Sequence, residues 1–273
     1  AQRQCEKGRG CADRRSPLSL GTSVTEADWR ELEETVAAHD PDHHVATFFA
    51  PSAKRRALIA LYAFDRELSH IGEAIREPMA GHVRLAWWRE QIGAIYDGKP
   101  PASPTGRALK AVIEAHALPR ALFDAVVDAR AHDVDEAPFV DEAALEAHAD
   151  QTTGNVMRLG LRVLSLADRA DEAARHAAIA MAYANHIREL ARLAKLRRCR
   201  LPLTWLAAER MNAEDLFAAT AMTPALSRIA RRAEARTKAA LRATNASRFR
   251  PSGMPVLSPS TLARVKSNPF APK

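Results

Sequence analysis

Apolar residues recur along most of the chain at the three- and four-residue spacing of an amphipathic helix. The run from residue 52 to about 76 shows the pattern most clearly, through Leu58, Leu61, Tyr62, Phe64 and Leu68. This helix has to stop before Pro78, because a residue that precedes proline is pushed out of the α region. A second helix is predicted over about 81–96, where Asp97 and Gly98 begin a proline-rich turn.

The remaining segments follow the same periodicity. A capping box, either Ser23 with Glu26 or Thr25 with Asp28, predicts a helix that ends near Asp40. Further helices are predicted over about 104–116, 119–131, 141–165, 169–195, 213–220 and 223–246. Because no segment alternates in the manner of a strand and no repeat is present, we predict an all-α, single-domain helical bundle.

The ends of the chain differ from this helical domain. Residues 1–22 are basic, polar and non-periodic, and we interpret them as a disordered basic leader, either a flexible tail or the remnant of an organellar presequence. The helical domain is predicted over 23–250. Residues 251–273 form a Pro-rich C-terminal tail, with one short helix predicted after Ser258.

Composition narrows the function classes. The chain has 273 residues, 47% of them apolar, and no uncharged apolar stretch approaches the length of about 18 residues needed for a membrane-spanning helix. Three cysteines without a CxxC pair argue against a disulfide framework and a zinc finger, and favour a reducing compartment. The net charge of +7 favours anionic partners, but only 5% of the residues are aromatic and none interleave with arginine, which argues against nucleic acid.

An all-α bundle can form a metal site from pairs of carboxylates on facing helices. Two aspartates four residues apart lie on one helix face, and two such pairs on facing helices can bind Mg²⁺ and neutralise a diphosphate leaving group. The one literal pair, Asp124 and Asp128, is compatible with a solvated face. Glu73 and Glu77 have the same spacing, but Glu77 directly precedes Pro78. His43 and His44 are expected on the surface of a turn.

Three segments resemble the squalene/phytoene synthase family. They are 47–88, with its Leu-Tyr-Ala-Phe and Leu-x-Trp-Trp elements, 148–161, and 185–202, and they occur in the family's order and spacing across about 45–245. The resemblance implies the isoprenoid synthase type of helical bundle, with helices 52–76 and 169–195 lining a central cavity.

The family's catalytic positions are only partly retained. By the resemblance, its four metal-binding aspartates fall on Ser69, Glu73, Glu189 and Leu193, while Asn185 and Arg188 match its Asn and Arg. We therefore assign no catalytic residue and regard these six positions as vestigial. No cofactor is expected. Mg²⁺ would be held by Glu73 and Glu189 only if the chain were an active transferase.

A subgroup of the family matches the sequence better than the synthases do. Complex I assembly factors that resemble phytoene synthase share Phe64-x-x-Glu67 in place of the first Asp-rich motif, and the Glu77-Pro78-Met79 turn. The resemblance implies a catalytically inactive protein that acts with respiratory complex I subunits or assembly factors, with a cavity that holds a lipid or isoprenoid or serves only as a scaffold. It further implies a location at the mitochondrial matrix face of the inner membrane, or in a bacterial cytoplasm beside the membrane.

Two alternatives remain open. One is an active prenyl-diphosphate transferase that performs head-to-head condensation with atypical metal ligands. The other is a peripheral membrane module that binds anionic lipid. The second alternative depends on a cationic stretch, which consists of Arg188, Arg192, Lys195, Arg197, Arg198 and Arg200. This stretch either binds anions and lipid or is a solvated face.

Overall fold

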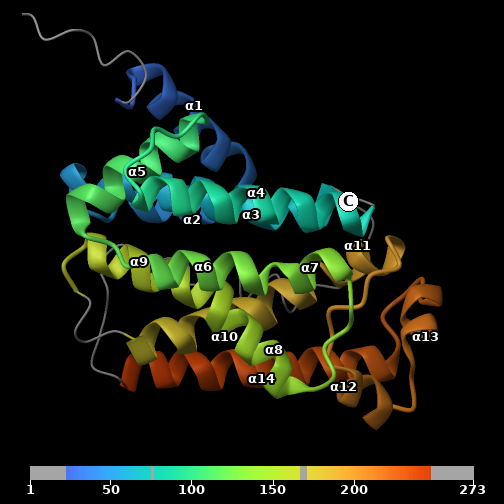
Figure 1. Ribbon diagram of the computed structural model, residues 1–273. Coiled ribbons are helices and arrows are strands. Elements are labelled where there is room, and N and C mark those ends of the chain that lie inside the picture. The colour runs from blue at the N-terminus through green and yellow to red at the C-terminus, as the bar shows by residue number, and fades with distance from the viewer. Residues whose placement is uncertain (1–22, 75–76, 167–170, 247–273) are drawn as a thin grey trace, which may run out of the picture.

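The computed structural model describes residues 23–74, 77–166 and 171–246, and all regular elements in these ranges are helices (Figure 1). The predicted all-α fold class is therefore confirmed. The leader over 1–22, the tail over 251–273 and the short helix after Ser258 lie outside the described residues. In chain order the elements are α1 (Glu26–His39), α2 (Pro41–Thr47), α3 (Ser52–Ala74), α4 (Pro78–Tyr96), α5 (Pro104–His116), α6 (Arg120–Ala129), α7 (Ala131–Asp135), α8 (Glu142–Ala149), the π-helical turn η1 (Asp150–Gly154), α9 (Asn155–Val163), α10 (Asp171–Arg188), α11 (Leu190–Lys195), α12 (Leu203–Ala208), α13 (Ala213–Ala218) and α14 (Pro224–Ala246).

Helix starts follow the local chemistry of capping. The box before α1 is the second of the two predicted: the Asp28 backbone N–H donates to Thr25 Oγ1 at 3.1 Å, and the Thr25 N–H donates to Asp28 Oδ2 at 2.9 Å. Helix α4 begins at Pro78, earlier than the predicted start near Gly81. Proline suits the first position of a helix, because its fixed φ is helical and its missing N–H would have no partner there.

Two predicted helices are interrupted. The predicted helix over 141–165 consists of α8 and α9 joined by η1. The one over 169–195 is interrupted at Glu189, between α10 and α11. Gly154 ends the π-helical turn at a crowded point, because a Cβ atom there would lie 2.8 Å from Asp150 Oδ1. The short helices α2, α7 and α12 were not predicted, since each is too brief to show a period.

The helices pack in two halves. Figure 1 shows α3 and α4 crossing the upper part of the molecule and α10 beside α14 in the lower part, with α6 and α9 between them. The upper core centres on Trp88, whose ring lies 5.2 Å from that of Phe64 on α3, and the lower core contains Trp205 stacked on Tyr183 at 5.4 Å. A smaller apolar cluster between α9 and α10, which includes Met157 and Met181, joins the halves.

Close backbone approach fixes the position of α7 against α3. A Cβ atom at Gly72 would lie 2.8 Å from the backbone oxygen of Asp133, so only glycine allows α7 to lie this close to α3. No helix in the described ranges is long and apolar enough to cross a bilayer.

Candidate functional site

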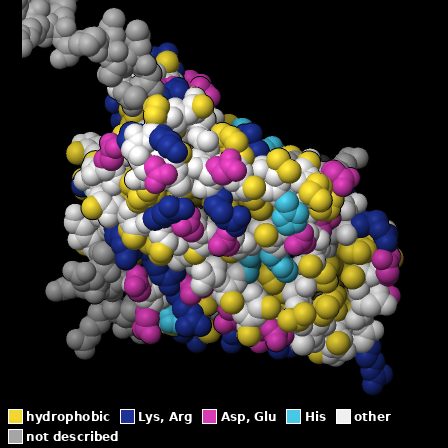
Figure 2. Space-filling view, in the orientation of Figure 1, with side chains coloured by type: hydrophobic (Ala, Val, Ile, Leu, Met, Phe, Trp, Pro, Cys, Tyr) yellow, Lys and Arg dark blue, Asp and Glu magenta, His cyan; other side chains and the backbone are white. Residues whose placement is uncertain are grey.

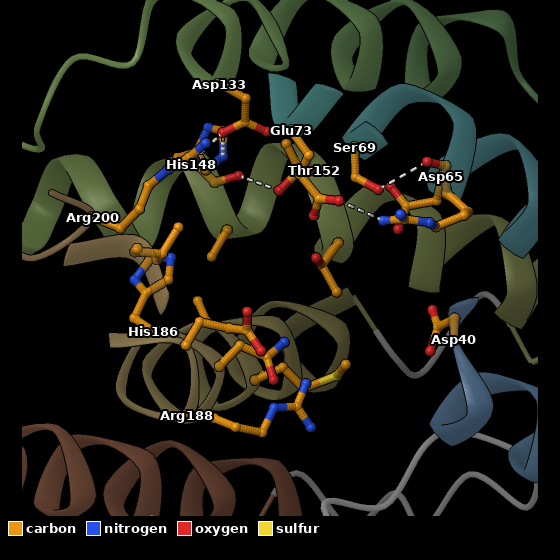
Figure 3. A pocket seen from close by; sticks show the side chains of 18 of the residues that line it. Asp40, Asp65, Ser69, Glu73, Asp133, His148, Thr152, His186, Arg188 and Arg200 are labelled. Atoms are coloured by element: carbon orange, nitrogen blue, oxygen red, sulfur yellow. Dashed lines mark hydrogen bonds and ion pairs between the residues drawn. The ribbon is translucent and has the colours of Figure 1, made fainter. Parts of the chain in front are cut away.

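A cavity of about 470 Å³ lies between α3 on one side and α10 and α11 on the other. The predicted role of these helices as cavity walls is thereby confirmed. Figure 3 shows Asp65, Ser69 and Glu73 of α3 across the cavity from His186 and Arg188 of α10. Its lining is mainly polar and charged, and includes Asp40, His43, Arg66, Arg130, Asp133, His148, Thr152, Asn185, Glu189, Arg192, Leu193, Arg198 and Arg200.

Asp133 is the centre of a buried ion-pair network. It lies on α7 with only 3% of its surface exposed, and it contacts Arg130 at 2.9 Å, His148 at 3.1 Å, and Arg200. Arg130 extends the network to Asp65 of α3, at 2.6 Å. Burial alone would raise the pKa of the Asp133 carboxyl, but the positive charges around it, led by Arg200, hold that pKa well below its usual range.

His186 lies beside this network on α10. Its Nδ1 atom is buried, with no hydrogen-bond partner among the described residues. Burial, followed by the charge of Arg200, lowers the pKa of the imidazole to about 3. The ring is therefore neutral at physiological pH, and the cavity keeps one uncharged nitrogen base among its fixed charges.

The six vestigial positions all lie at this one cavity. On α3, the Ser69 hydroxyl donates to the backbone oxygen of Arg66 at 3.0 Å, and the Arg66 guanidinium contacts Glu73 at 3.1 Å. At the junction of α10 and α11, Glu189 is bound by Arg192, one helical turn further on. Each of the two retained carboxylates is thus already neutralised by an arginine of its own segment.

These residues do not fit a magnesium ion. Mg²⁺ demands near-octahedral oxygen ligation and is held in proteins by carboxylates that are free to bind it. Ser69 and Leu193 remove two of the family's four carboxylates, and Glu73 and Glu189 are engaged by arginine. Within 23–74, 77–166 and 171–246, no group of three or more His, Cys, Asp or Glu side chains is placed to hold a metal.

The structure divides the cationic stretch instead of presenting it as one surface. Arg188, Arg192, Arg198 and Arg200 line the cavity, whereas Lys195 and Arg197 lie outside its lining. Five of the six are in ion pairs: Arg188 with Asp42, Arg192 with Glu189, Arg197 with Glu214, Arg198 with Glu136, and Arg200 with Asp133.

Burial also separates these cations. Only 10% of the Arg198 side chain is exposed, and it donates to the backbone oxygen of Gly72 at 2.7 Å, so it joins the loop after α11 to α3. On the face shown in Figure 2, Lys and Arg side chains alternate with Asp and Glu. A direct contact between this stretch and an anion stays a prediction.

Other candidate residues lie away from the cavity or differ from expectation. Asp124 and Asp128 are not part of the lining, and are bound by Arg120 and Arg89 respectively. The surface position expected for His43 is wrong: the residue is 7% exposed, and its Nδ1 lies 2.6 Å from Asp40 Oδ2 at the cavity wall. Desolvation works against its protonation, but the Asp40 carboxylate outweighs it and raises the pKa of His43.

Sequence reasoning also missed Asp65, Asp133, His148 and His186. Asp65 had a usable signal, because it precedes Ser69 by four residues and therefore shares its helix face. Arg130 and Asp133 fit the pattern of the assembly-factor subgroup, but the sequence did not place Asp133 at the cavity, because its five-residue helix shows no period.

Comparison with known proteins agrees with the geometry. The family model for squalene/phytoene synthase matches residues 36–271, so the chain belongs to the squalene/phytoene synthase family. The resemblance inferred from the motifs is thereby confirmed.

Individual relatives fall into two functional groups. NADH dehydrogenase (ubiquinone) complex I, assembly factor 6, of Bos taurus is 26% identical over 199 residues, which cover 72% of this chain and 59% of that protein. The phytoene synthase of Rhodobacter capsulatus is 28% identical over 218 residues, covering 77% of this chain and 62% of that enzyme. The chain therefore spans only 59% and 62% of the length of these relatives.

A solved structure shares the fold. The squalene synthase HpnC of Alicyclobacillus acidocaldarius superposes with a TM-score of 0.71 over 88% of each chain, at 21% sequence identity. At that identity, the likeness establishes the all-α isoprenoid synthase fold alone.

Replacing Asp133 tests the buried network. The substitution Asp133→Asn should lower the free energy of unfolding by about 3–5 kcal/mol, because it leaves Arg130 and Arg200 without their shared carboxylate. The matched control is Asp128→Asn. The Asp128 side chain is 59% exposed in its pair with Arg89, so this substitution should lower the free energy of unfolding by no more than about 1 kcal/mol. Urea unfolding followed by circular dichroism measures both, and equal losses would contradict a central role for Asp133.

Replacing His186 tests the buried neutral imidazole. Its folded pKa of about 3 lies below the value of about 6.5 in the unfolded chain, so its destabilising effect is absent above pH 6.5 and grows as the pH falls towards 3. Between pH 7 and pH 5 the effect is about 2 kcal/mol. His186→Gln should therefore lose less stability over this interval than the parent. Chemical unfolding at each pH decides this, and identical pH profiles for the His186 variant and the parent would refute it.

Proposed function

We propose that this chain is a non-catalytic member of the squalene/phytoene synthase family that acts in the assembly of respiratory complex I. The observation that carries the proposal is the state of the four positions that bind metal in the synthases. Ser69 and Leu193 offer no carboxylate, and Glu73 and Glu189 are neutralised by Arg66 and Arg192.

The loss of metal sites matters because of the reaction's electrostatics. Ionising an allylic diphosphate separates a cation from a highly charged leaving group, and Mg²⁺ supplies the compensating charge in enzymes of this type. The arginines of this cavity do not replace it, because the charges of Arg188, Arg192, Arg198 and Arg200 are balanced by carboxylates. Without surplus positive charge, the leaving group would lack stabilisation.

The relatives support the proposed role in complex I assembly. Complex I assembly factor 6 of Bos taurus and of Homo sapiens are both 26% identical to this chain. By this likeness, the partners are complex I subunits or other assembly factors, and the place of action is the matrix face of the inner mitochondrial membrane or the corresponding bacterial membrane face. In this view the cavity serves as scaffold or holds a lipid or isoprenoid without converting it.

Absence of prenyl transfer is the first prediction of this proposal. Incubation with farnesyl or geranylgeranyl diphosphate, Mg²⁺ and NADPH should release no more pyrophosphate than a Glu73→Ala, Glu189→Ala double variant does. The phytoene synthase of Rhodobacter capsulatus serves as the positive control. Pyrophosphate release above the double variant would instead support the active transferase, with Glu73 and Glu189 as its metal ligands.

A role in complex I assembly is the second prediction. Deleting the chain in the organism that carries it should lower the NADH oxidation that depends on complex I and leave succinate oxidation unchanged. Both the parent and the Glu73→Ala, Glu189→Ala chain should restore NADH oxidation, because the proposed role needs no metal. Rescue by the parent but not by a folded double variant would show that the carboxylates, and hence catalysis, are required.

A further inference from the structure

Two adjacent phenylalanines project from the turn between α2 and α3. The exposed fraction is 51% for Phe48 and 72% for Phe49, and Val45, one helical turn earlier, is 54% exposed. Scattered apolar side chains are normal on a protein surface, but two neighbouring aromatic rings with an exposed valine form a patch that water solvates poorly. We refer to Val45, Phe48 and Phe49 as the aromatic tip.

The turn that carries the aromatic tip is fixed by its own hydrogen bonds. Three consecutive backbone N–H groups each donate to the backbone oxygen three residues earlier. The pairs are Phe48 with Val45 at 3.1 Å, Phe49 with Ala46 at 3.2 Å, and Ala50 with Thr47 at 3.1 Å. Ala46, Thr47 and Ala50 are buried beneath it. The phenylalanines are therefore held outward by a turn whose small residues point inward.

Most Lys and Arg side chains in the described part of the chain form ion pairs, but two cations beside the aromatic tip do not. The Arg55 guanidinium lies 4.8 Å from the centre of the Phe48 ring, and neither Lys54 nor Arg55 forms an ion pair with any residue that the structure describes. The next residue, Arg56, is bound to Glu26 at 2.6 Å. The turn thus combines exposed aromatic rings with uncompensated positive charge.

The carboxylate of Asp42, on the helix that leads into the aromatic tip, does not cancel this charge, because it is paired with Arg188 at 3.3 Å.

We infer that the aromatic tip is a membrane anchor that inserts Phe48 and Phe49 into the interface of an anionic lipid surface, with Lys54 and Arg55 at the headgroups. Phenylalanine side chains of interfacial segments bury at the boundary between headgroups and acyl chains, and cations beside them are attracted to anionic lipid. The inference is separate from the cationic stretch at 188–200, and it rests on neither the loss of catalysis nor the complex I role.

The inference has a geometric consequence for the cavity. Asp42 and His43, on the helix that leads into the aromatic tip, belong to the cavity lining. An inserted tip would therefore hold this wall of the cavity close to the lipid headgroups.

Vesicle binding by the full chain tests the anchor. The parent should co-sediment with vesicles of phosphatidylcholine and cardiolipin, and Phe48→Ser, Phe49→Ser should weaken that binding by about tenfold or more, because two aromatic side chains no longer leave water. The matched control is Met79→Ser, Val83→Ser on α4, where the removed side chains are 69% and 64% exposed, and which should bind as the parent does. Phe49→Ser alone, at the most exposed site, should give part of the loss even if the double variant unfolds.

The charges are tested separately. Lys54→Gln, Arg55→Gln should weaken binding and reduce its dependence on salt, while vesicles of phosphatidylcholine alone should bind the parent poorly. A Phe49→Trp chain should be quenched by brominated lipid more strongly than the parent. The inference is overturned if the parent does not bind anionic vesicles or if the folded Phe variants bind as tightly as the parent. It is also overturned if those variants keep vesicle binding and lose only complex I assembly, which would make the tip a protein-docking site.

Discussion

The carboxylate of Asp133 joins segments that belong to the two hydrophobic cores of the described fold. It receives Arg130 from the junction of α6 and α7, His148 from α8, and Arg200 from the loop that follows α11. Through Arg130 the same network reaches Asp65 on α3. One buried anion therefore joins four cavity-lining segments, and its desolvation is offset by the charges of Arg130 and Arg200 together with the His148 contact.

This network holds a polar cavity in place by pairs between the protein's own side chains. In a metal-dependent bundle, bound Mg²⁺ would neutralise the facing carboxylates. In this chain, arginine pairs within and between the helices perform the same neutralisation, as Arg66 does for Glu73 and Arg198 for Glu136. The polar interior is therefore electrostatically balanced without a ligand, which suits a protein that keeps its shape for recognition.

The fold was largely predictable from the sequence, but the site was predictable only in part. Long helices such as α3 and α14 were predicted from the helical spacing of their apolar residues. The motifs at 47–88 and 185–202 indicated the family and the two helices that line the cavity. Asp133 could not be placed, because α7 is too short to show a period and its partners lie far along the chain. The pairing of the cationic stretch could not be predicted for the same reason. The sequence shows six neighbouring positive charges, but their ion pairs are formed with acidic residues such as Asp42 and Glu136, which are brought near only by the fold.

The pairing of Arg66 with Glu73 also bears on how such a protein changes over evolutionary time. A mutation that restored an aspartate at Ser69 would add a carboxylate beside one that is already claimed by an arginine, while Leu193 would still face it without a ligand atom. Regaining the metal would require several substitutions together, each of little use alone. If the chain is non-catalytic, as proposed, the arginine pairs make a return to metal binding a change of several residues at once.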